Sequence, residues 1–363
     1  MCTLRIGEWL LRTLFIRKGT VMAPRNYRID NVKGVLIILV VIGHFLLPIS
    51  TTRFTTNSQY LIYTFHMPCF IFISGYLAKG VYRDGRFKWG KLARLAWLYL
   101  LFELGVHVTE GLLEGQIGWR VDLFHESGAP WYLLALLIWY LFVPLCSRLG
   151  KWASLALALA VGLAGGYAGS GLGDFLAADR VFAFAPFFFM GYFFTGRELK
   201  GLCSGGRRAA AVILGALVGA GIFLGTYDFL EPYRLAVYGA MYDRFSPELY
   251  SLCWLIRLIC YGAAGALSFG LIAFLPDRRL PFLTKLGQRT LSVYVLHRLI
   301  RDLCQYFDLY RFLNVHSKAQ VLLMMAGCVA LSAVLAWGPV YGAFQWLSEA
   351  PFAVWEKVTG KKR

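Results

Sequence analysis

Charged residues are scarce in this chain of 363 residues, and long stretches of polar sequence are lacking. Only 16% of the residues are charged, whereas soluble globular chains carry about 25%. Hydrophobic residues make up 58% of the chain, and the mean hydropathy is +0.58. Because the deficit of charge extends over nearly the whole length, the composition excludes a soluble globular protein. It predicts an all-α integral membrane protein with many spans.

Closely spaced cysteine pairs are also absent. None of the eight cysteines is separated from another by two residues, and most of them lie in apolar runs. Such a pattern excludes the common spacing of a zinc site and gives no disulfide framework. We therefore expect buried free thiols and no bound metal.

Acidic residues are fewer than basic ones, with 20 against 37, so the net charge is +17. In a soluble protein this excess would suggest a nucleic-acid partner. In a membrane protein, Lys and Arg collect in cytoplasmic loops and set the orientation of the spans. We therefore expect membrane lipids around the chain and no nucleic acid.

A cleavable signal peptide is not expected at the N-terminus. Residues 1–27 form a basic amphipathic tail, which fits a segment on the membrane surface, and Met22 is an alternative start. We expect one transmembrane domain at 28–350 and a basic cytoplasmic tail at 351–363.

About ten segments are apolar enough to be membrane-spanning helices. These are Val32–Leu47, Tyr60–Ala78, Leu92–Val108, Trp131–Cys146, Trp152–Ala168, Val181–Thr195, Ala209–Thr226, Ser251–Leu275, Thr290–Phe307 and Val321–Trp346. One of the pair between 131 and 168 could instead be re-entrant. Loops rich in Lys and Arg alternate with loops that have few of them along the chain. Because the basic loops face the cytoplasm, ten spans place both termini there. We expect the plasma or inner membrane of the cell as the location.

Two histidines lie in the first two spans. His44 follows Lys33 by eleven residues, which places it about 16 Å deeper and just past the midplane. The second span runs inward from Tyr60, so His66 lies about 9 Å below the outer surface. An imidazole inside a span costs free energy and marks a functional site. We therefore expect His44 and His66 at a similar level in the outer half of the bundle.

Five motifs in order resemble one known family. They are Asp30-Asn31-Val32-Lys33-Gly34 through Gly43-His44, Phe65-His66-Met67-Pro68 with Ser74-Gly75-Tyr76, Pro130-Trp131-Tyr132-Leu133, Ala185–Tyr192, and Gly287–His297. Together they resemble the membrane-bound acyltransferase 3 superfamily, in the branch of fucose 4-O-acetylase-like sugar O-acetyltransferases. The matches cover residues 28 to 300. Two departures are Lys33, where the wider superfamily has Arg, and Leu98, where a Pro is usual.

The resemblance implies transfer of an acyl group, expected to be acetyl, from acyl-CoA to a hydroxyl of a cell-surface or lipid-linked saccharide. Such a reaction needs a general base near neutral pKa, and histidine provides one. We predict that His44 is this base, against the alternative of a core histidine bonded to a carbonyl. We expect His66 to share the proton or bind the acceptor. Alternatively, it caps the carbonyl freed by Pro68.

Acyl-CoA carries phosphates that need cations at the cytoplasmic face. Lys33, Lys88, Lys91 and Arg94 provide them, although each could instead serve only to orient the spans. Acetyl-CoA is thus expected as a co-substrate.

Further polar residues fall inside predicted spans, and some are candidates for the site. They are Glu103, His107, Arg257, Tyr294, His297, Arg298 and Arg301. We predict a catalytic role for Glu103, which could orient a histidine or pair with Arg257. We predict that Trp131, Arg257 and Tyr294 bind substrate. His297 matches the family but is expected nearer the inner face.

A transporter or flippase for a lipid-linked glycan is the alternative, with His44 and His66 as a proton relay. It fits the many spans but gives no role to the basic loop at 88–94 beyond topology. The sequence does not specify the acceptor, the hydroxyl position, the acyl length, the side of transfer or the oligomeric state.

Overall fold

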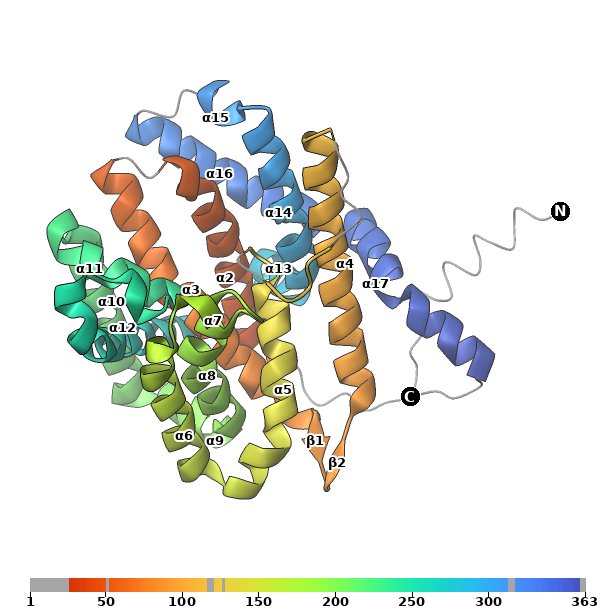
Figure 1. Ribbon diagram of the computed structural model, residues 1–363, viewed down its shortest axis with the longest axis horizontal. Coiled ribbons are helices and arrows are strands. Elements are labelled where there is room, and N and C mark those ends of the chain that lie inside the picture. Colours follow the sequence, from red (N-terminus) through yellow and green to blue (C-terminus); the bar gives the residue numbers. More distant parts are fainter. Residues whose placement is uncertain (1–25, 50–51, 116–120, 126–127, 313–316, 360–363) are drawn as a thin grey trace.

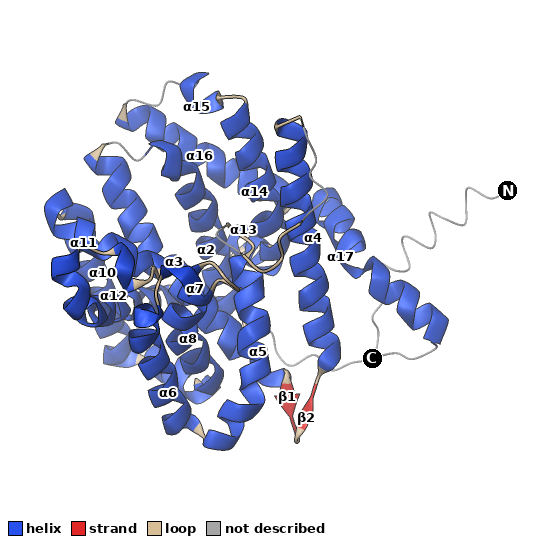
Figure 2. Ribbon diagram, in the orientation of Figure 1, coloured by secondary structure: helices blue, strands red, loops and turns tan. Residues whose placement is uncertain are grey.

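The computed structural model describes residues 26–49, 52–115, 121–125, 128–312 and 317–359. Within these ranges the chain is almost entirely helical, as Figure 2 shows. The alternative start at Met22 and most of the predicted tail at 1–27 lie outside the described residues. The predicted class, an all-α membrane protein, is therefore confirmed.

The first part of the chain forms nine helices and one hairpin among the described residues (Figure 1). They are α2 (Tyr27–Leu46), α3 (Arg53–Leu77), β1 (Tyr82–Arg83), β2 (Arg86–Phe87), α4 (Trp89–Leu113), α5 (Trp131–Leu149), α6 (Lys151–Ala164), α7 (Ser170–Gly173), α8 (Ala178–Phe193), α9 (Gly196–Leu202) and α10 (Gly205–Leu224). The second part continues with α11 (Tyr227–Tyr238), α12 (Cys253–Phe274), α13 (Pro281–Gln288), α14 (Thr290–Tyr306), α15 (Leu309–Phe312), α16 (Lys318–Leu335) and α17 (Gly338–Thr359).

Eight helical segments among the described residues are long and apolar enough to cross a membrane: α2, α3, α4, α5, α6 together with the 3₁₀ turn that extends it to Ala168, α10, α12 and α16. The other two predicted spans correspond to α8 and α14, which have 16 and 17 residues. Both are shorter than the roughly 20 residues that a straight crossing needs. The protein is thus a multi-pass membrane protein.

The last predicted span, Val321–Trp346, is wrong as a single helix. The structure divides it into α16, which ends at Leu335, and α17, which begins at Gly338. Pro339 gives the reason, because a proline ring clashes with the carbonyl four residues earlier, here that of Leu335. The second helix then continues to Thr359, across the predicted domain boundary at 350.

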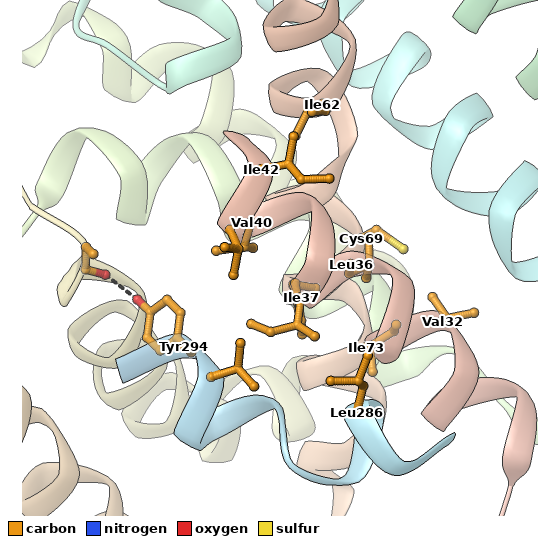
Figure 3. Packing of buried hydrophobic residues seen from close by; sticks show 14 of the residues in the cluster. Val32, Leu36, Ile37, Val40, Ile42, Ile62, Cys69, Ile73, Leu286 and Tyr294 are labelled. Carbon is orange, nitrogen blue, oxygen red and sulfur yellow. Dashed lines mark hydrogen bonds between the residues drawn. The ribbon is translucent and has the colours of Figure 1, made fainter. Parts of the chain in front are cut away.

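Helices α2 and α3 lie at the centre of the bundle. Their buried side chains form the main apolar cluster together with residues of α4, α13 and α14, and Figure 3 shows Leu36, Ile37 and Val40 of α2 within it. Helix α3 packs closely on α8 through two glycines. A Cβ on Gly75 would overlap the carbonyl of Phe188, and one on Gly191 would overlap the carbonyl of Phe72. Small residues at this contact let the two backbones approach.

Helix α13 ends beside the first turn of α2, and α14 follows directly after it. The backbone of Gly287, just before α14, packs directly on the carbonyl of Asp30 in the first turn of α2. The Asn31 side chain donates hydrogen bonds to the carbonyls of Pro276 and Arg278, at 3.1 and 2.9 Å. Helix α14 therefore begins near the end of the bundle at which α2 starts, and it packs against α2.

Candidate active site

A cavity of about 360 Å³ opens where α2, α3, α8 and α14 meet. Its volume lies within the range of about 300–1,000 Å³ that is typical of small-molecule sites. Histidine, tyrosine, tryptophan and arginine side chains supply its polar and aromatic lining. The lining residues are Val40, His44, Leu47, Tyr63, His66, Met67, Gly128, Ala129, Trp131, Arg180, Phe184, Val237, Tyr238, Tyr294, Arg298 and Arg301.

His44 pairs with His297 at the edge of this cavity. The His44 Nδ1 and the His297 Nε2 atoms are 2.8 Å apart, and the two rings stack with centroids 5.0 Å apart. The Nδ1 of His297 lies 2.9 Å from the carbonyl of Val293. His297 is fully buried, whereas His44 is partly exposed. His297 therefore lies at the same level as His44, whereas the sequence predicted a position nearer the inner face.

The hydrogen-bond pattern determines which nitrogen of each neutral ring carries the proton. A carbonyl oxygen can only accept, so His297 donates from Nδ1 to Val293 and accepts at Nε2. His44 must then donate from its own Nδ1. The Nε2 of His44 is left with a lone pair, as a general base requires.

His66 is oriented in a similar way from α3. Its Nδ1 lies 2.7 Å from the carbonyl of Ile62, one turn earlier in the same helix, so the neutral ring donates there. The carbonyl freed by Pro68 belongs to Thr64, four residues before the proline. The hydrogen bond of His66 thus goes to a different carbonyl. Its ring contacts the edge of Tyr63, with centroids 4.8 Å apart.

Two of the predicted substrate-binding residues, Trp131 and Tyr294, line the cavity. The Tyr294 hydroxyl donates to the carbonyl of Ala129, as the dashed line in Figure 3 shows. Trp131 stacks on Phe184 with centroids 5.5 Å apart and lies under the guanidinium of Arg180. Tyr294 therefore anchors the segment that leads into α5, whose first residue is Trp131.

Arg257 and Glu103 do not line the cavity. Arg257 is fully buried, and its guanidinium donates to the carbonyls of Gly162, Gly239 and Ala240. Glu103 is also buried, and its Oε1 has no hydrogen-bond partner among the described residues. No ion pair joins the two in the described part of the chain.

The predicted donor-binding cations, Lys33, Lys88, Lys91 and Arg94, also lie outside the cavity lining. Lys33 pairs with Asp30 at 3.2 Å. Arg94 pairs with two glutamates of α17, Glu349 at 3.1 Å and Glu356 at 3.7 Å. The sequence analysis gave these acidic partners no role. Helix α4 continues without a break through Leu98, so the missing proline does not disturb it.

Several lining residues were not among the predicted site residues. Tyr63, Tyr238 and Arg180 belong to this group, as do Arg298 and Arg301. A signal for the last two was present, because they follow Tyr294 by four and seven residues on one helical face. No group of three or more potential metal ligands occurs in the part of the chain that the structure describes.

Comparison with known proteins gives the family. The nodulation protein NolL of Sinorhizobium fredii (strain NBRC 101917 / NGR234) is 36% identical over 176 residues, which cover 41% of this chain and 45% of that protein. NolL of Mesorhizobium japonicum (strain LMG 29417 / CECT 9101 / MAFF 303099) is 32% identical over 156 residues, 39% of this chain and 42% of that protein. The chain thus spans less than half the length of these curated relatives.

No solved structure matches the chain significantly. Residues 26–337 match the family described as an acyltransferase domain, and this range includes all five ordered motifs. The chain therefore belongs to the acyltransferase 3 family.

Proposed function

We propose that this protein is an integral-membrane O-acyltransferase that moves an acetyl group from acetyl-CoA to a hydroxyl of a saccharide, with His44 as the general base. The observation that carries this proposal is the chain of hydrogen bonds from His44 through His297 to the Val293 carbonyl. It leaves the Nε2 of a partly exposed imidazole available for proton abstraction, beside a cavity of substrate size. Membership of the acyltransferase family supports the same reaction.

The reaction balances without a metal. The acceptor hydroxyl gives its proton to the Nε2 of His44 while its oxygen attacks the thioester carbonyl. The carbon–sulfur bond then breaks, and the protonated His44 returns the proton to the leaving thiolate, giving the ester and free CoA. His297 touches neither substrate in this scheme and acts by orienting His44, as the third member of a triad orients the base.

The cavity suits a saccharide acceptor. The aromatic residues Trp131, Tyr63 and Tyr238 line it, and contacts with Phe184 and the Arg180 guanidinium fix the plane of Trp131. Such rings can contact the apolar faces of sugar rings, while the polar groups around them provide orientation. The acceptor would be a cell-surface or lipid-linked glycan in the plasma or inner membrane.

The donor would approach from the opposite end. Lys33 lies eleven residues before His44 on the same helix, so the two are about 16 Å apart along the axis. Lys33, Lys88 and Lys91 would contact the CoA phosphates at that end. Arg94 is held by α17 and would contribute less than the sequence predicts.

A transfer assay tests the proposal. Purified full-length protein is incubated with radiolabelled acetyl-CoA and a panel of saccharides, and the labelled product is isolated. We expect His44→Gln to lower transfer by about 10²- to 10⁴-fold, the usual contribution of a general base. His125→Gln is the control, because this exposed histidine pairs with Asp122 outside the cavity. Full transfer by His44→Gln would refute the assignment. Uptake of a glycan into vesicles without acetylation would favour the transporter.

A further inference from the structure

Three arginines line the cavity from two different helices. Arg180 comes from the first turn of α8, and Arg298 and Arg301 come from α14. No aspartate or glutamate is among the lining residues. Charged groups within a membrane bundle are costly, so three cations around one cavity indicate that the site has a use for positive charge.

Carboxylates hold Arg298 and Arg301 from outside the cavity. The Oδ1 of Asp302 contacts Arg298 and lies 3.0 Å from Arg301, and Glu110 lies 3.3 Å from Arg298. Neither acidic residue lines the cavity. A guanidinium has five donors in a fixed plane. A carboxylate on one edge therefore fixes the plane and leaves the other edges for a second anion.

Two polar atoms at the cavity are left unsatisfied. The Nε of Arg301 and the hydroxyl of Tyr63 are both shielded from solvent, and neither has a hydrogen-bond partner among the described residues. Both side chains line the same cavity. An unmet buried donor costs about 1–3 kcal/mol, so two in one place point to a missing ligand.

We propose that Arg180, Arg298 and Arg301, together with Tyr63, bind a phosphate or carboxylate group of the acceptor, so that the natural acceptor is an anionic saccharide. This inference rests on the proposed function, because it names the substrate class of the same cavity. Guanidinium groups bind phosphate and carboxylate through paired, charge-assisted hydrogen bonds. An anion held there lies in the same cavity as His44.

The phosphates of CoA are the other possible source of the anion. The position of the arginines argues against them. Arg298 and Arg301 follow His297 on α14, towards the end away from the shared start of α2 and α14. Lys33 lies close to that start and about 16 Å from His44 along α2. The arginines and Lys33 therefore lie at opposite ends, and one CoA head group cannot occupy both.

Binding to the purified full-length protein tests the inference without requiring transfer. Dissociation constants are measured by microscale thermophoresis for glucose 1-phosphate, glucose and CoA. We expect glucose 1-phosphate to bind at least about tenfold more tightly than glucose. Arg301→Gln and Arg180→Gln should remove this preference while changing the affinity for CoA less than twofold. Arg244→Gln is the matched control, since this exposed arginine pairs with Asp174 and does not line the cavity.

Three results would overturn the inference. Wild-type protein that does not prefer glucose 1-phosphate to glucose would show that the arginines are structural. A parallel loss of CoA binding in Arg301→Gln and Arg180→Gln would assign the anion site to the donor. An equal effect of Arg244→Gln would show a general charge effect. A failure of the proposed function would instead appear as an inactive wild type in the transfer assay, with the binding pattern unchanged.

Discussion

The pairing of His44 with His297 makes a sharp prediction about the role of the second histidine. If His297 acts only by accepting the Nδ1 hydrogen of His44, any side chain that accepts there should preserve part of the activity. His297→Gln provides an amide oxygen that can accept, whereas His297→Leu has a similar size and no acceptor. We therefore expect the order of activity wild type, Gln variant, Leu variant.

The magnitude follows from the lost hydrogen bond. In the Leu variant the buried Nδ1–H of His44 is unsatisfied, which costs about 1–3 kcal/mol. If the same free energy is added to the activation barrier because His44 is less well oriented, kcat drops by about five- to 150-fold. This conversion uses about 1.4 kcal/mol for each tenfold change in rate. This loss is smaller than the loss of about 10²- to 10⁴-fold that we expect when His44 itself is replaced.

The assay is acetyl transfer at saturating acetyl-CoA, with kcat and KM determined for each variant. Size-exclusion profiles and Tm values establish that the variants are folded. We expect the loss to appear in kcat with KM for acetyl-CoA nearly unchanged, because His297 lies outside the cavity lining. Wild-type kcat in His297→Leu, or equal losses in the Gln and Leu variants, would refute the orienting role.

Three other predictions concern the fold and its orientation. Gly75→Ala places a methyl group against the carbonyl of Phe188, so we expect a loss of stability of about 1–3 kcal/mol, measured as a lower Tm. At Glu198, hydrogen bonds and a lysine lower the carboxyl pKa to about 2. The Tm advantage of wild type over Glu198→Gln should therefore be complete above about pH 4.5, the unfolded pKa, and disappear as the pH falls towards 2. If both termini lie in the cytoplasm, as the loop charges predict, an external thiol reagent should label Glu248→Cys in intact cells but reach Arg86→Cys only after permeabilisation.

Controls make these three results interpretable. Gly221→Ala adds a methyl group into open space within α10, so it should leave Tm unchanged or raise it. Loss of stability in both glycine variants would contradict the packing explanation. Lys151→Met removes the 2.6 Å partner of Glu198 and should weaken the acid dependence in the same pH range. Labelling of Arg86→Cys from outside, above the background of the native cysteines, would reverse the orientation.

The sequence predicted the elements of this fold better than their contacts. Apolar runs located each predicted span on a helix, because hydrophobicity and length are local properties of the chain. The two failures have physical causes. Pro339 ends α16, so the last span is two helices. His297 was expected nearer the inner face, but it lies level with His44, because the packing of α13 and α14 on α2 depends on contacts between distant residues such as Gly287 and Asp30.

The pairing of His44 with His297 could not be predicted from spacing, because the two residues are 253 positions apart and meet only through the tertiary fold. The same holds for Arg94, whose glutamate partners lie on α17. The predicted roles of Trp131 and Tyr294 remain proposals, although both side chains line the cavity. Lining by itself indicates access to a substrate, and only the assays above test binding.

The separation of the two ends of the bundle connects the proposed base with the proposed anion site. If CoA phosphates bind near Lys33, the thioester reaches His44 only with the pantetheine arm extended along α2, so the acyl carbon enters the cavity end-on. The space beside Trp131, Arg180 and Arg301 then stays open for the acceptor. An acceptor anchored there by its charge places a neutral hydroxyl, rather than the charged group, next to the Nε2 of His44. The distance between the anionic group and each hydroxyl would therefore determine which hydroxyl is acetylated. A series of sugar phosphates with the phosphate at different positions can test this rule.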